Sequence, residues 1–405
     1  MESICATSLL IKTLFTREVQ FSLSFYPLLL EQHVKEILLE RATYFIFIGC
    51  GGGLCKQFKK KHCLIIDSES EEYLHESIIH ITDKKSVTET LYSLLNLLHN
   101  TTTSAQIAVV GSFASRYGID KDVLAIALEQ GVLHKERGLP IFGQQTRSIH
   151  KALEYSVELL IPGVTGNEGA ALSLLSEVGI ASKSGSLWRK FADLSKEEMA
   201  SLIEIIALKK YCDKESLLVD RYILPHELPG PTRDVAEYAE LIRACANMDQ
   251  CSVAIGTLLG DKAMREKAIE TEHLFRREIA KALAYYEENP KQEDKRCIIL
   301  QGQDTISSRV IGSLATILTK RWKEKKFILI TAYDEGQMVK ASLRMSGRTT
   351  ENLLHIAQTM VKSINGVCVG TKDAVSISVQ RSKEEEFIAF AKSSLEQTAL
   401  EEAIL

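Results

Sequence analysis

The 405-residue sequence lacks the excess of positive charge that is typical of nucleic-acid-binding proteins, since 49 Lys and Arg stand against 53 Asp and Glu. Basic character is confined to two short runs, residues 56–62 and 320–326. The sequence also lacks an apolar run of the about 18–20 residues that a membrane span needs. Its first residues, MESICATSLLIK, show neither the basic region nor the cleavage pattern of a signal peptide. We therefore expect a globular cytoplasmic protein without a membrane segment.

A disulfide framework and a zinc site are also missing. Nine cysteines form an odd and scattered set, which predicts reduced core residues. Cys50, Cys55, His62 and Cys63 lie close together along the chain, but their spacing fits no common zinc motif and Cys63 belongs to an apolar run. The sequence predicts no bound metal and no cofactor.

The first 130 residues alternate apolar runs with amphipathic patterns. In residues 28–42, for example, Leu30, Val34, Ile37 and Leu38 recur at helical spacing. Continuous apolar strands between amphipathic helices are typical of a parallel sheet covered on both faces. The predicted helices are 28–42, 86–98 and 122–131, and the predicted strands are 44–49, 63–67, 77–81 and 105–111.

Strand patterns vanish between about residues 145 and 290. The long, strongly charged pattern at 262–288 predicts a helix that connects two lobes, and residues 288–296 have the composition of a linker. Strand and helix patterns alternate again after the linker, which predicts a second, smaller α/β lobe. The other predicted helices of the middle region are 147–160, 167–178, 195–210 and 234–247.

Three glycines, Gly49, Gly51 and Gly53, follow the first predicted strand. A dinucleotide-binding loop needs G-x-G-x-x-G and an acidic residue about 20 positions later, whereas the acidic candidate Asp67 comes 14 residues after Gly53. A Walker loop needs a hydroxyl after its lysine, where this chain has Gln57. A Rossmann-like nucleotide-binding protein therefore stays an alternative, beside a purely structural tight turn.

Three longer stretches, residues 132–180, 232–261 and 365–388, resemble archaeal RecJ-like proteins of the DHH phosphoesterase superfamily, in the same order. The resemblance covers most of the chain and implies a two-lobed α/β fold. It implies a degenerate DHH domain at 1–164, a helical insertion at 165–212, helices including the connecting one at 213–290, and a degenerate DHH-associated domain at 297–400.

Active members of this superfamily hydrolyse phosphodiesters with two divalent ions, usually manganese. Two such ions about 4 Å apart repel each other by roughly 17 kcal/mol at an effective dielectric near 20, so several carboxylates must offset the repulsion. The resemblance assigns six positions of this chain to metal ligands and to a phosphate-binding histidine. Only one of them keeps a carboxylate. The resemblance therefore implies a degenerate enzyme without catalytic or metal-binding residues. These positions are Ile48, Cys50, Gly52, Asp67, Ser115 and Thr371.

Five residues are candidates for contacts with single-stranded nucleic acid. Lys59, Lys60 and Lys61 supply local positive charge, and Ser342 and Arg344 resemble a Ser-x-Arg segment that approaches substrate in active relatives. Ordinary strand polarity is the alternative for Ser342 and Arg344. A strand-end turn or helix cap is likewise the alternative for Asp67.

Catalytically degenerate members of the superfamily include Cdc45-like replisome subunits, which lie beside the GINS complex and the MCM helicase. The resemblance thus implies a non-catalytic replisome scaffold that binds GINS, reaches MCM through it and holds single-stranded DNA weakly. A RecJ-type single-strand-specific exonuclease with a relocated metal site is the first alternative, and the nucleotide-binding protein is the second.

Overall fold

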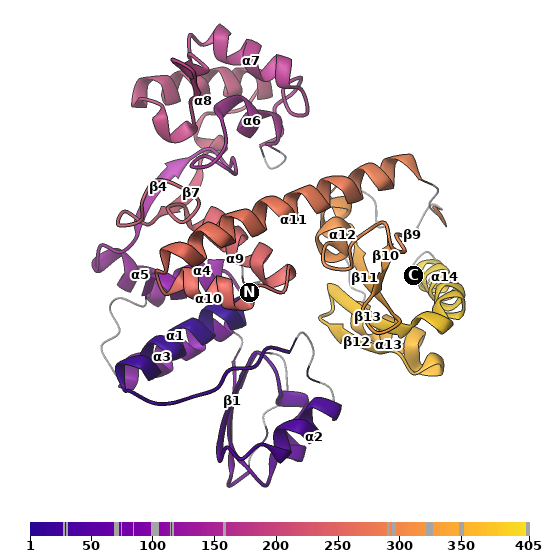
Figure 1. The fold of residues 1–405 in the computed structure, drawn as a ribbon. Coiled ribbons are helices and arrows are strands. Elements are labelled where there is room, and N and C mark those ends of the chain that lie inside the picture. The colour runs from indigo at the N-terminus through magenta and orange to yellow at the C-terminus, as the bar shows by residue number, and fades with distance from the viewer. Residues whose placement is uncertain are drawn as a thin grey trace. The chain divides into compact units, whose positions relative to one another are not determined.

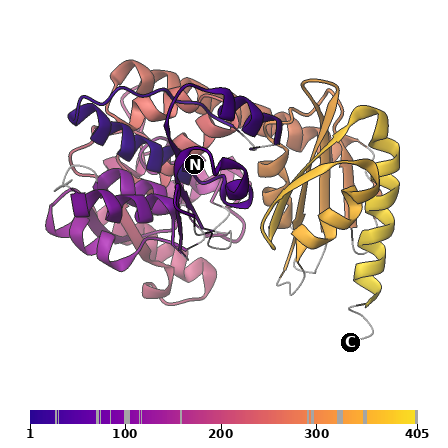
Figure 2. The ribbon, with the colours of Figure 1, turned by 90° about the horizontal axis from the view of Figure 1, so that it is seen from below.

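The computed structural model describes residues 1–26, 29, 31–68, 73, 75–83, 85–98, 105–113, 115, 117–156, 159–289, 292–293, 297–320, 327–347 and 352–401. The chain forms two compact units, residues 1–269 and 270–405 (Figure 1 and Figure 2). Most of the predicted linker and the basic run from residue 321 onward lie outside the described residues. Within them, no helix combines the length and apolarity of a membrane span.

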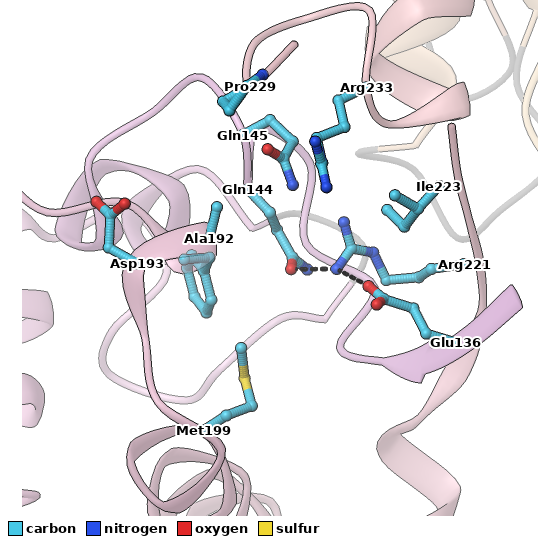
Figure 3. A pocket seen from close by; sticks show the side chains of 11 residues that line it. Glu136, Gln144, Gln145, Ala192, Asp193, Met199, Arg221, Ile223, Pro229 and Arg233 are labelled. Carbon is cyan, nitrogen blue, oxygen red and sulfur yellow. Dashed lines mark hydrogen bonds and ion pairs between the residues drawn. The ribbon is translucent and has the colours of Figure 1, made fainter. Parts of the chain in front are cut away.

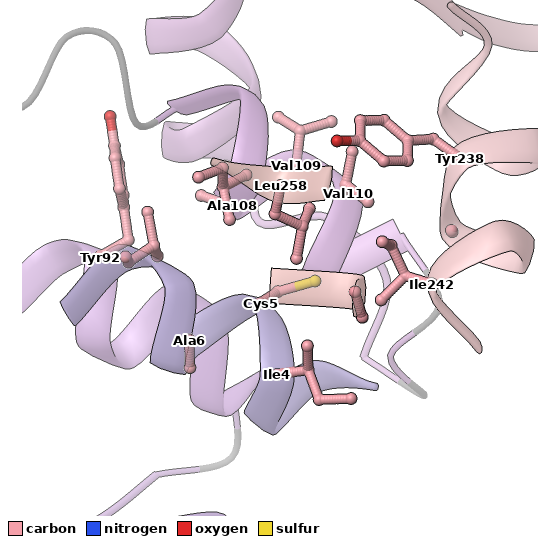
Figure 4. Close-up of a cluster of buried hydrophobic side chains, with 14 of the residues drawn as sticks. Ile4, Cys5, Ala6, Tyr92, Ala108, Val109, Val110, Tyr238, Ile242 and Leu258 are labelled. Carbon is pink, nitrogen blue, oxygen red and sulfur yellow. The ribbon is translucent and has the colours of Figure 1, made fainter. Parts of the chain in front are cut away.

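Packed helices form the main core of the first unit (Figure 4). Cys5, Leu91, Val109, Tyr238 and Ala254 are among its fully buried members. The sequence pattern predicts the second and the fourth helix of the following list but not the other three. They are α1 (Glu2–Thr16), α3 (Val87–Leu98), α4 (Ala105–Phe113), α9 (Val235–Asn247) and α10 (Cys251–Leu258).

Helix α4 corrects a prediction, because residues 105–111 were expected to form a strand. Seven of its nine residues are buried, from Ala105 through Ser112 with Gln106 as the interruption. A helix that is enclosed by other helices has no polar stripe, so its sequence is a short apolar run like that of a buried strand. The parallel sheet consequently has three strands among the described residues rather than four.

The sheet of the first unit is parallel, in the order β1 (Tyr44–Ile48), β2 (His62–Asp67) and β3 (Ile78–Thr82), and it confirms three predicted strands. Helix α2 (Glu31–Leu39) and a 3-10 helix (Gly52–Phe58) lie on one face, where Val34, Phe47, Phe58 and Ile65 are buried together. The other face is covered only in part, which corrects the expectation of a sheet enclosed on both sides. Tyr44, Ile46 and Ile79 remain exposed there.

Residues 134–223 contain an antiparallel ribbon and a small helical body. The ribbon pairs β4 (His134–Gly138) with β7 (Val219–Ile223), and residues between them bury a separate core around Leu153, Leu174 and Leu202. The expected absence of strands after residue 145 is therefore wrong. These strands are short and mostly polar, so their sequence lacks the alternation of apolar residues by which a strand is predicted. The body holds α6 (Ile149–Glu154), α7 (Glu168–Glu177), the hairpin β5 (Lys183–Ser184) to β6 (Leu187–Trp188), and α8 (Lys196–Lys210). Helix α5 (Lys121–Glu129) precedes the ribbon.

Helix α11 (Lys262–Glu288) confirms the long predicted helix and contains the boundary between the two units. In the described residues that follow α11, the second unit contains a six-stranded sheet and three α-helices, which confirms the predicted α/β lobe. The finer division into four segments stays a prediction. In sheet order the strands are β12 (Val367–Gly370), β13 (Ala374–Gln380), β11 (Met338–Met345), β10 (Phe327–Asp334), β9 (Cys297–Gln301) and β8 (Gln292–Glu293), and the helices are α12 (Ile311–Thr319), α13 (Leu353–Val361) and α14 (Glu384–Glu401).

Candidate functional site

Asp67 lies at the carboxyl end of β2 and forms a buried pair with His80 of β3. The Asp67 Oδ2 atom is 3.3 Å from His80 Nε2, and both residues are less than 10% exposed. His80 Nδ1 accepts the backbone N–H of Tyr73 at 3.1 Å. A nitrogen that accepts cannot carry the hydrogen of a neutral ring, so Nε2 is the donor toward the carboxylate. The only carboxylate among the motif positions is thus held by a histidine that the sequence pattern does not single out.

The glycine loop between β1 and the 3-10 helix is shaped by close packing. Gly49 and Gly51 have φ angles of +71° and +98°, which favour glycine, and a Cβ atom on Gly49 would lie 2.0 Å from Ser3 Oγ. Ile48 packs against the main core and Gly52 begins the 3-10 helix. Burial, with a smaller contribution from the Asp67 charge, raises the pKa of the Cys50 thiol. This loop therefore presents a neutral thiol and an apolar side chain beside Asp67.

Ser115 and Thr371 each belong to a local turn. Ser115 follows helix α4 rather than a strand, and its Oγ accepts the N–H of Tyr117 at 3.2 Å. Thr371 Oγ1 accepts the N–H of Asp373 at 3.2 Å between β12 and β13. Within the described part of the chain, no three His, Cys, Asp or Glu side chains gather in a way that could hold a metal ion.

The three lysines after the 3-10 helix differ in their surroundings. Lys61 Nζ donates to the carbonyl oxygens of Glu40 at 2.7 Å and Ala42 at 3.0 Å, and it lies 5.3 Å from the centroid of the Phe45 ring. Lys59 and Lys60 are exposed. A phosphate could therefore approach the ammonium groups of Lys59 and Lys60 directly. To bind Lys61, it would have to replace the hydrogen bonds to the two carbonyl oxygens.

Ser342 and Arg344 come together on β11 of the second unit. Arg344 donates to the carbonyl oxygens of Leu343 at 2.9 Å and Val375 at 3.2 Å, and its burial lowers the pKa of the guanidinium. Ser342 is 3% exposed, and its Oγ has no hydrogen-bond partner among the described residues. A Cβ atom built on Gly312 at the start of α12 would lie 3.7 Å from Arg344 Nη2 and 3.9 Å from Ser342 Oγ. The two predicted residues thus share one buried corner beside a helix N-terminus.

A cavity of about 450 Å³ lies between the β4–β7 ribbon and the helical body (Figure 3). Arg221 lines the cavity and forms ion pairs with Glu136 and Asp234 and a hydrogen bond with Gln144. No sequence motif points to this cavity, because its residues come from four separate stretches of the chain. It is lined by Glu136, Gln144, Gln145, Phe191, Ala192, Asp193, Met199, Arg221, Ile223, Pro229 and Arg233.

Glu237 of α9 holds the loop that forms one side of this cavity. Its carboxylate accepts the N–H of Gln145 at 2.9 Å and the hydroxyl of Thr146 at 2.7 Å. Burial raises the pKa of Glu237, and the two hydrogen bonds oppose that rise. The loop at residues 144–147 is therefore tied to the main core through one buried carboxyl group.

Comparison with known families and proteins identifies part of the first unit. Residues 141–216 match the DHH-CID domain. An uncharacterized protein of Methanocaldococcus jannaschii is 30% identical over 113 residues, which make up 28% of this chain and 23% of that relative. The match thus spans about a quarter of the relative's length.

Solved structures resemble almost the whole chain. CDC45 from Entamoeba histolytica matches with a TM-score of 0.71 and 11% identity, over 97% of this chain and 93% of that one. RecJ with Mn²⁺ from Thermus thermophilus matches with a TM-score of 0.54 and 14% identity, over 98% of this chain and 50% of that one. A manganese-bound exonuclease RecJ matches with a TM-score of 0.54 and 16% identity, over 98% and 87%. At these identities the likeness concerns the fold.

Proposed function

Since the chain has the RecJ/Cdc45-like fold of the DHH superfamily and carries a DHH-CID domain, we propose that it is a non-catalytic replisome subunit that binds GINS and, through it, the MCM helicase. The observation that carries the proposal is the match to CDC45 over nearly the full length of both chains. The match with one RecJ covers only half of that enzyme.

The side chains at the motif positions support the non-catalytic part of the proposal. Ile48 and Gly52 offer no ligand atom, and Asp67 is hydrogen-bonded to His80. Ser115 and Thr371 accept backbone N–H groups in their own turns. A two-metal phosphodiesterase needs several free carboxylates around one point, and the motif positions supply one that is already paired.

Association with GINS is the direct test of this function. We expect the chain to co-elute with GINS subunits from the same organism in size-exclusion chromatography at moderate salt and micromolar concentration. An interface of about 1,600 Å² would be typical of such a complex. MCM should join only when GINS is present. Separate elution of folded partners would contradict the scaffold function.

The first alternative, a RecJ-type exonuclease, is favoured by the fold shared with manganese-bound RecJ. Against it, we expect no hydrolysis of single-stranded DNA or RNA with Mn²⁺ or Mg²⁺, because the motif positions lack metal ligands. The assay compares the chain with an Asp67→Ala variant. Activity that survives further purification and disappears in Asp67→Ala would establish the exonuclease instead.

The second alternative, a nucleotide-binding protein, predicts that ATP or NAD raises the thermal unfolding temperature of the chain. The same preparation can be used for this measurement.

Binding of single-stranded DNA should be weak and electrostatic. If Lys59, Lys60, Lys61 and Arg344 together neutralise about 3–4 phosphates, log affinity should fall against log salt with a slope of about −2 to −3, and Lys61 and Arg344 must then give up their hydrogen bonds to backbone carbonyls. Replacing Lys59 and Lys60 by Ala should make the slope shallower by about 1.4, since each contact contributes about 0.7. The control carries Lys121→Ala and Lys196→Ala, which should leave the slope unchanged. A flat response in the unaltered chain would exclude this mode of binding.

A further inference from the structure

The cavity beside the β4–β7 ribbon is lined by side chains of two kinds. Its volume of about 450 Å³ falls within the range of small-molecule sites, about 300–1,000 Å³, in which a few polar groups are set in an apolar lining. The apolar part of the lining consists of Phe191, Ala192, Met199, Ile223 and Pro229. Most of the hydrogen-bond donors belong to Gln144, Gln145, Arg221 and Arg233.

Arg221 and Gln144 are already engaged within the chain. Arg221 forms ion pairs with Glu136 and Asp234, and it donates to the carboxamide oxygen of Gln144. The carboxamide nitrogen of Gln144 donates to the Leu139 carbonyl at 2.9 Å. The charge of Arg221 is thus neutralised by the protein itself, and both ends of the Gln144 carboxamide have partners.

Arg233 differs from Arg221 because it is half-buried without a counter-charge. Its Nη1 atom donates to the backbone carbonyl of Glu227 at 2.9 Å, and the guanidinium forms no ion pair with any residue that the structure describes. A guanidinium has five N–H donors, so most of those of Arg233 are unused. Arginines that are shielded from water are normally paired. The cavity therefore contains one positive charge that the described part of the chain does not neutralise.

Gln145 adds unused hydrogen-bonding groups to the same space. Its backbone N–H is fixed by Glu237, whereas its side-chain carboxamide makes no hydrogen bond to another described residue. Figure 3 shows the polar ends of Gln145 and Arg233 turned into the same part of the cavity, above Arg221. A carboxylate accepts hydrogen bonds at both of its oxygens and forms paired bonds with arginine. These two side chains therefore suit one carboxylate group.

We propose that this cavity binds a small organic monocarboxylate, whose carboxylate is held by Arg233 and Gln145 and whose apolar portion lies near Met199. A dianion such as phosphate fits less well, because Glu136 and Asp193 also line the cavity and would repel a second negative charge. A free carboxylic acid and the C-terminal residue of a protein share the required chemistry, and the test distinguishes these two sources.

The test uses the full chain, labelled with ¹³C at its methionine methyl groups, and the probe hexanoate. The NMR signal of Met199, assigned with Met199→Leu, should shift until the site is saturated. The signal of Met264, which packs against the main core, should not move. Hexanamide lacks the charge, acetate lacks the apolar portion and phosphate is a dianion, so each should bind about tenfold more weakly or worse. N-acetylleucine represents a protein C-terminus. If it binds more tightly than hexanoate, the ligand is a protein C-terminus, and if it binds more weakly, the ligand is a free acid.

Two substitutions make the assignment specific. Arg233→Gln removes the unneutralised charge, so it should weaken the binding of hexanoate about tenfold or more and leave that of hexanamide unchanged. Arg243→Gln, outside the cavity, is the matched control and should alter neither affinity. Gln145→Ala removes a side chain without a described hydrogen bond, so it keeps the fold even if Arg233→Gln does not, and it should also weaken the binding of hexanoate.

Three results would overturn the proposal. The first is a Met199 signal that hexanoate does not move. The second is an affinity for hexanamide or phosphate equal to that for hexanoate. The third is an unchanged affinity for hexanoate in both Arg233→Gln and Gln145→Ala.

Discussion

An Arg221→Ala variant is expected to be less stable than the unaltered chain by about 3–5 kcal/mol. Arg221 and Asp234 are 12% and 8% exposed, and Asp234 also caps helix α9 by accepting the N–H groups of Ala236 and Glu237. Removing the guanidinium leaves a buried carboxylate without its counter-charge and leaves Gln144 and Glu136 without their shared donor. Most of the lost stability therefore comes from polar groups, above all the Asp234 carboxylate, that stay buried without a partner.

Urea unfolding measures this effect in the transition of the first unit. A decrease of about 3 kcal/mol corresponds to a midpoint lower by about 1 M at a slope near 3 kcal/mol per M. Arg243→Ala is the matched control, because Arg243 forms an exposed pair with Glu240 within one helix. Such pairs contribute about 0.3–0.5 kcal/mol. Equal midpoints for the two variants would show that the Arg221 network adds no stability.

The sequence predicts most of the fold where apolar periodicity is strong. Helix α8 lies within its predicted range and begins with a capping box, in which Ser195 and Glu198 exchange hydrogen bonds, and the long helix α11 has its predicted bounds. The pattern fails where tertiary surroundings replace periodicity. Helix α4 is enclosed on all sides, and β4 pairs with β7 through polar residues, so neither resembles an isolated helix or strand in sequence.

The candidate site was predictable only in part. Asp67 can be found because it ends an apolar strand, and Ser342 with Arg344 because they resemble the Ser-x-Arg segment of active relatives. His80 could not be found, since the register that aligns Ile65 with His80 and Asp67 with Thr82 depends on how two parallel strands slide past each other. The cavity around Arg221 depends on contacts such as Arg221 with Glu136, which are 85 residues apart.

Substitution of Gly111 by Ala is expected to destabilise the first unit by about 1–3 kcal/mol, although the same change stabilises an isolated helix by roughly 1 kcal/mol. A Cβ atom on Gly111 would lie 2.6 Å from Thr88 Oγ1 and 2.7 Å from Cys5 Cβ. Helices α1, α3 and α4 therefore meet at this glycine, and a methyl group must push them apart.

Gly53→Ala is the matched control, because nothing lies within 4 Å of a Cβ atom built on Gly53. We expect Gly53→Ala to leave stability unchanged or to raise it by up to about 1 kcal/mol. Thr88→Ser should recover part of the Gly111→Ala loss, since it removes the Cγ2 atom that lies 2.7 Å from the new methyl group and keeps the hydroxyl that donates to the Glu2 carbonyl. Thermal and urea unfolding of Gly111→Ala, Gly53→Ala and the Gly111→Ala, Thr88→Ser double variant measure these differences in stability. If Gly111→Ala is as stable as Gly53→Ala, the three helices tolerate a wider spacing, and the close approach at Gly111 is not what holds α1 against the core.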